Sequence, residues 1–164
     1  MFEQPAAGLE RLLEAGVPIG KLQLGCALEA PDAQAKAALA ACAEPRLLHQ
    51  VRLCLDGRLL GAPDVDQALA SDLPRAPAWR ARFHVPPHRR ELGRGLRATQ
   101  DEMLGLLDVL VRRADVRPQL EVEVDAWALL PEGERPGSAD ERASAIAATL
   151  SWVEAQLQRR GLLA

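Results

Sequence analysis

Three short segments of the chain alternate polar and apolar residues, and this alternation is the strongest constraint on the fold. The segments span residues 21–25, 80–85 and 119–125. Side chains two apart in a strand share a face, so each segment predicts a β-strand with one polar and one apolar face. The polar positions are Lys21, Gln23, Arg80, Arg82, His84, Glu121, Glu123 and Asp125.

Helices are predicted between these strands. A first helix is expected over 6–15, and a second begins at Asp32, a residue type that caps helix N-termini. Two later helices are predicted by the capping-box motifs Thr-Gln-Asp-Glu at 99–102 and Ser-Ala-Asp-Glu at 138–141. The order of elements is therefore largely strand, helix, strand, helix.

The segment from 47 to 60 departs from this order. Two apolar-rich runs flank Asp56-Gly57, a dipeptide typical of a two-residue β-hairpin turn. We interpret this hairpin as an insertion between the strand–helix repeats.

Strands that alternate with helices predict parallel pairing through right-handed crossovers. Parallel strands in open sheets are apolar on both faces, whereas these carry charges at every second position. A barrel interior accommodates such charges, so we expect α/β architecture with parallel β/α repeats, as the C-terminal portion of a TIM (β/α)8 barrel. The alternative is a sheet with one face in water. A complete barrel takes about 250 residues. We therefore expect the 164 residues to form a single partial barrel domain, which either lacks an upstream portion or associates with a second copy.

Several stretches of the chain carry a family resemblance, namely residues 16–23, 48–50, 83–86, 99–101 and 120–123, together with Trp127 and 130–131. In these stretches the chain resembles the C-terminal part of the EboE-like metabolite traffic proteins. The resemblance implies a xylose-isomerase-like TIM barrel, of which the chain would supply the last three strand–helix units. The chain departs from the family pattern at 124–126, where Val-Asp-Ala stands in place of an expected threonine and aromatic residue.

In a TIM barrel the working residues lie at the C-terminal ends of the strands. This rule selects Gln23, His84 and Glu123 as ligands of a divalent metal ion, which would be Mn, Mg, Co or Zn. Glu121 and Glu123 are the candidate catalytic carboxylates, because sugar isomerases of this kind move a proton with a carboxylate. Ion pairing of these glutamates with Lys21 or Arg82 is the competing explanation.

Four further residues are predicted to bind substrate. Lys21 and Arg82 share the polar faces, His88 lies in the loop after the second strand, and Trp127 lies in the loop after the third. His49, before the hairpin, suits a core hydrogen bond as readily as a ligand role.

The composition disfavours several classes of partner. The net charge of −3 and the pI near 5.7 give no positive field for nucleic acid. No apolar run approaches the roughly 20 residues that cross a bilayer, so we expect no membrane insertion and a cytoplasmic protein. The three cysteines have no metal-binding or redox spacing and predict buried thiols in a reducing compartment.

Two functions follow from these residues. One is a protein that binds a small sugar- or polyol-like metabolite without transforming it, as the resemblance to traffic proteins implies. The other is a metal-dependent sugar or sugar-phosphate isomerase or epimerase. The sequence alone leaves both open.

Overall fold

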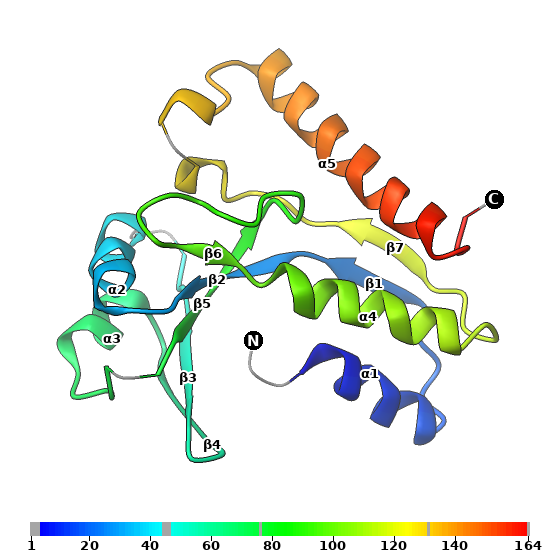
Figure 1. Ribbon diagram of the computed structural model, residues 1–164, viewed down its shortest axis with the longest axis horizontal. Helices are drawn as coiled ribbons and strands as arrows, with labels where there is room; N and C mark the ends of the chain where they lie inside the picture. The colour runs from blue at the N-terminus through cyan, green and yellow to red at the C-terminus, as the bar shows by residue number, and fades with distance from the viewer. Residues whose placement is uncertain (1–3, 44–46, 76, 131, 164) are drawn as a thin grey trace.

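The computed structural model describes residues 4–43, 47–75, 77–130 and 132–163, which form a mixed α/β fold with two sheets (Figure 1). The strands are β1 (Lys21–Leu24), β2 (Cys26–Ala30), β3 (Val51–Leu55), β4 (Arg58–Ala62), β5 (Trp79–Val85), β6 (Arg97–Ala98) and β7 (Gln119–Val122). The helices are α1 (Pro5–Glu14), α2 (Ala33–Leu39), α3 (Val65–Ala70), α4 (Gln100–Arg112) and α5 (Ala139–Arg159). Short 3-10 helices are η1 (Ala40–Cys42), η2 (Trp127–Leu129) and η3 (Glu132–Glu134).

The larger sheet has five antiparallel strands in the order β4-β3-β5-β2-β6. The β3–β4 hairpin turns at Asp56 and Gly57, whose φ angles of 49° and 76° suit a turn that needs two left-handed residues. The predicted hairpin is therefore confirmed. It forms one edge of this sheet.

The smaller sheet is the parallel pair of β1 and β7, with Gln23 opposite Glu121. β1 continues into β2 after the single residue Gly25, and Figure 1 shows the two as successive arrows of one extended stretch. The first half of this stretch pairs with β7 and the second half with β5 and β6. Gly25 therefore marks the junction of the two sheets.

The prediction of parallel β/α repeats forming part of a TIM barrel is wrong. β5 runs antiparallel to β2, and β1 with β7 is the one parallel pair in the described part of the chain. The alternation of polar and apolar residues is typical of an antiparallel sheet with one face covered and one face in water. The alternative left open by the sequence, a sheet with one wet face, is thus the better description of β5.

The core lies on the apolar face of the larger sheet, where α2 contacts β2 and α3 contacts β4. Fully buried side chains on this face include Leu28, Val51, Leu53 and Trp79. α1 packs against α4, which runs beside the β1–β7 pair in Figure 1. α5 is joined to the end of α4 by an ion pair of Arg160 Nε with Asp108 Oδ1 at 2.7 Å.

Most predicted helix starts are confirmed. The Asp32 side chain accepts from the Ala35 amide at 2.9 Å, and Ser138 forms the predicted capping box with Glu141 at the start of α5. The capping box predicted at Thr99 is wrong, because the Thr99 hydroxyl oxygen accepts from the Ala27 amide of β2 at 2.9 Å. The threonine thus ties the start of α4 to the neighbouring strand.

Candidate functional site

Polar side chains from three strands meet where the two sheets join. We call this set the junction cluster; it consists of Lys21, Gln23, His84, Glu121 and Glu123. Lys21 and Gln23 come from β1 and His84 from β5, while Glu121 lies in β7. The Glu123 amide donates to the Leu24 carbonyl at 3.0 Å, so Glu123 continues the pairing of β7 with β1. Glu121 and Glu123 therefore lie on the same face.

Backbone contacts hold the end of β7 against β5. The amides of Asp125 and Ala126 both donate to the His84 carbonyl at 3.2 Å. A Cβ atom on Gly25 would lie 3.3 Å from the Glu123 carbonyl oxygen and 3.5 Å from His84 Nδ1. Gly25 thus permits the close approach that brings the cluster together. The sequence carries a signal for this role, a glycine directly after an alternating strand.

Glu121 is the most fully satisfied member of the cluster. Its carboxylate accepts from Lys21 Nζ at 2.8 Å and from Gln23 Nε2 at 3.2 Å. These two hydrogen bonds lower the pKa of the Glu121 carboxyl below its usual range, and the bond from Lys21 has the larger effect. The side chain is 43% exposed, so the ionised carboxylate is open to solvent.

His84 and Glu123 form a second pair within the cluster. His84 Nδ1 lies 3.3 Å from Glu123 Oε2, and both side chains are partly exposed, by 29% and 40%. The sequence selected Gln23, His84 and Glu123 at the strand ends, and the structure pairs His84 with Glu123 and Gln23 with Glu121. The structure also contains the ion pairing that the sequence offered as the competing explanation, since Lys21 pairs with Glu121.

The other predicted substrate-binding residues lie outside this cluster of contacts. Arg82 is exposed on β5, and its carbonyl oxygen accepts a hydrogen bond from His49 Nδ1 at 2.9 Å. His49 itself is buried and stacks on Phe83 with ring centres 3.8 Å apart, so it occupies a core position. Trp127 is buried in the core, where its side chain serves packing.

His88 bonds to α5 and is not in contact with the cluster in the described residues. Its Nδ1 lies 3.0 Å from the Thr149 hydroxyl, which in turn donates to the Ala145 carbonyl at 2.9 Å. Because the hydroxyl proton is used in that second bond, the Thr149 oxygen accepts from His88. Burial, followed by the charge of Arg89, lowers the pKa of His88.

The donor set of the cluster contains one imidazole, two carboxylates and one amide oxygen. Across residues 4–43, 47–75, 77–130 and 132–163, no three His, Cys, Asp or Glu side chains gather as a metal-binding group. The His84–Glu123 pair would thus need Gln23, Glu121 or water to complete a coordination shell.

Comparison with known proteins assigns no relative to this chain. No protein-family model, no curated protein and no solved structure matches it. The resemblance to the EboE-like proteins stays a prediction. None of the described helices has the length and apolar character needed to cross a membrane.

Proposed function

We propose that the junction cluster binds a small, polyhydroxylated metabolite of the sugar or polyol type. The observation that carries the proposal is the convergence of Lys21, Gln23, Glu121, His84 and Glu123 from three strands. Adjacent hydroxyls both donate and accept hydrogen bonds, and a lysine, an amide, an imidazole and two carboxylates supply both kinds of partner. The partly exposed side chains leave these groups accessible from solvent.

The electrostatics of Glu121 favour binding over catalysis. An efficient general base has a pKa near the working pH. The hydrogen bonds from Lys21 and Gln23 lower the pKa of Glu121, which weakens it as a base but keeps it ionised as a hydrogen-bond acceptor. A metabolite hydroxyl would take the place of one of these internal donors.

The second candidate is a metal-dependent sugar isomerase or epimerase. It is favoured by the His84–Glu123 pair, in which an imidazole nitrogen and a carboxylate oxygen lie 3.3 Å apart on one side of the junction. In this version Gln23 completes the ligand set around Mn, Mg, Co or Zn, and Glu121 is the remaining carboxylate.

Cellular location and assembly belong to the same proposal. Cys26, Cys42 and Cys54 are all free thiols, which supports a reducing, cytoplasmic environment. In the described part of the chain no third strand joins β1 and β7, and an isolated two-stranded sheet is marginally stable. These open edges support association with a second copy, which sedimentation equilibrium would measure.

The test is a calorimetric titration of the wild-type chain with D-xylose and with ribitol, each in the presence and in the absence of Mn²⁺. We expect binding without metal, weakened about tenfold by Glu121→Gln, since hydrogen bonds to charged groups contribute about 1.5–3 kcal/mol. Asp115→Asn is the matched control, because Asp115 is an exposed carboxylate paired with Arg113 outside the cluster.

Three results separate the candidates. Binding that is equal in wild type and Glu121→Gln contradicts a role for the cluster. Binding that requires Mn²⁺, disappears in His84→Ala and is accompanied by conversion of xylose to its ketose favours the isomerase. Absence of binding by both probes contradicts the proposal for this class of ligand.

A further inference from the structure

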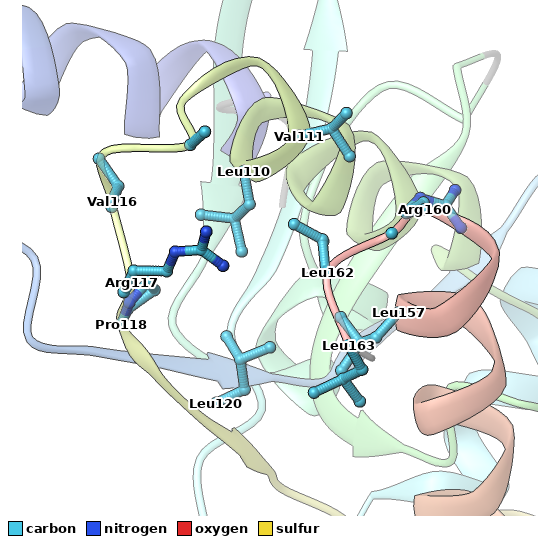
Figure 2. A pocket seen from close by; sticks show the side chains of 12 residues that line it. Leu110, Val111, Val116, Arg117, Pro118, Leu120, Leu157, Arg160, Leu162 and Leu163 are labelled. Carbon is cyan, nitrogen blue, oxygen red and sulfur yellow. The ribbon is translucent and has the colours of Figure 1, made fainter.

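A separate cavity lies on the face of β7 opposite the junction cluster, because Leu120 lines the cavity while the next residue, Glu121, belongs to the cluster. It opens to solvent and is lined by the C-terminal ends of α4 and α5 and by the residues that lead into β7, among them the exposed Arg117 (Figure 2). Its volume of about 510 Å³ falls within the range of roughly 300–1,000 Å³ found for small-molecule pockets. The apolar walls come from Leu110, Val111, Leu120, Leu157, Leu162 and Leu163.

Two arginines, Arg160 and Arg117, line this cavity, and only Arg160 forms an ion pair within the described part of the chain. Arg160 pairs through Nε with Asp108 at 2.7 Å and donates from Nη1 to the Gln156 side-chain oxygen at 3.1 Å. Arg117 makes no hydrogen bond or ion pair with any residue that the structure describes. Figure 2 shows its side chain extending from the loop before β7 into the cavity, between Leu110 and Leu120.

The cavity therefore combines leucine walls with an arginine that has no ion-pair partner among the described residues. Apolar walls favour a hydrocarbon, and a guanidinium binds a carboxylate through two parallel hydrogen bonds. We propose that this cavity binds a small amphiphilic carboxylate, with its tail among the leucines and its carboxylate on Arg117. The inference is independent of the polyol site, because the two sites share no lining residue.

The concave shape indicates a small molecule as the occupant. The walls come from three elements, α4, β7 and the end of α5, which line the cavity on three sides. A neutral hydrocarbon would leave Arg117 without a counter-charge, and a short carboxylate would leave the leucine walls unfilled. The tail and the charge are thus both required for tight binding.

The experiment is calorimetry with decanoate, compared with decanol, which lacks the charge, and with butyrate, which lacks most of the tail. Decanoate is expected to bind more tightly than either. Arg117→Gln should weaken decanoate binding about tenfold and leave decanol binding unchanged, because it removes a charge-assisted hydrogen bond. Arg58→Gln, in the exposed hairpin strand β4, makes the same charge change far from the cavity and is the matched control.

A second variant tests the apolar wall. Leu163 is 44% exposed at the rim, so Leu163→Asp places a like charge beside the ligand without disturbing the core, and it should also weaken decanoate binding. Methyl resonances of Leu110, Leu120 and Leu157 should shift on titration. Equal binding of decanoate and decanol, an unchanged affinity in Arg117→Gln, no binding of decanoate, or shifts confined to other leucines would each overturn the proposal.

Discussion

Replacing Thr99 with valine tests how the start of α4 is fixed to β2. The Thr99 hydroxyl accepts from the Ala27 amide at 2.9 Å, and the Thr99 amide donates to the Ala27 carbonyl at 3.0 Å. Valine retains the shape and the second bond but leaves the Ala27 amide without an acceptor. An unsatisfied buried donor costs about 1–3 kcal/mol. Because Ala27 is only partly buried, we expect a loss of about 1–1.5 kcal/mol, from the lower part of that range.

The assay is urea unfolding of the wild type, Thr99→Val and Thr99→Ser. In thermal unfolding, the same loss of free energy corresponds to a decrease in Tm of about 2–6 °C for a chain of this size. Thr99→Ser retains the hydroxyl and should lie close to the wild type. Amide hydrogen exchange separates the two possible roles of Thr99, because loss of the bond to β2 exposes the Ala27 amide, whereas loss of a capping box would expose the Glu102 amide.

The reasoning is refuted by a Thr99→Val protein whose free energy of unfolding equals that of the wild type within about 0.3 kcal/mol, a difference too small for a lost hydrogen bond. It is also refuted if Glu102 loses exchange protection while Ala27 does not.

Three further predictions concern the surroundings of the site. Burial, then the charges of Glu102 and Asp101, raise the pKa of Cys26 to about 12, so iodoacetamide at pH 8 should modify Cys26 only after unfolding, as read by mass spectrometry. The lowered pKa of His88 means that the unfolded chain binds more protons below pH 6.5. The free energy of unfolding should therefore decrease as the pH is lowered below 6.5, and it should decrease less steeply in His88→Gln. Identical slopes in the two proteins would contradict a role for His88 in this pH dependence. Gly25→Val should destabilise the junction by about 1–3 kcal/mol through crowding, in contrast to Gly20→Val, where a Cβ meets no atom within 4 Å.

Local structure was largely predictable from the sequence because it depends on neighbouring residues. Asp56-Gly57 adopts the left-handed conformations that a two-residue hairpin needs, and Ser138 with Glu141 completes a capping box. Thr99 fits the same motif but bonds to Ala27, which is 72 residues away. A tertiary partner can compete for a capping side chain, and the sequence of the motif alone does not reveal it.

The direction of strand pairing was the main error in the prediction. The alternation in β5 suits a barrel interior and an antiparallel sheet equally, since both give a strand one polar and one apolar face. β3 and β5 pair antiparallel, with Arg52 opposite Arg80, and this contact joins the hairpin to the sheet. The hairpin that the sequence indicated as an insertion therefore forms part of the sheet that decides the fold.

The proximity of two predicted site residues was predictable from the sequence, although the fold that holds them was not. His84 and Glu123 lie 3.3 Å apart although β5 and β7 belong to different sheets. Convergence required only that the ends of these strands meet, which the Asp125 and Ala126 amides achieve by donating to the His84 carbonyl. The positions of Trp127 and His88 depended on core packing and on α5, and the strand pattern carries no information on either.

The most direct measurement of the central claim is a two-dimensional NMR titration of the wild-type chain with ribitol. If the junction cluster binds polyhydroxylated metabolites, the His84 ring and the Gly25 amide should shift in a saturable manner, with the Glu121→Gln protein responding about tenfold more weakly. Unchanged His84 and Gly25 signals up to saturating ribitol, or equal responses from the two proteins, would contradict the account.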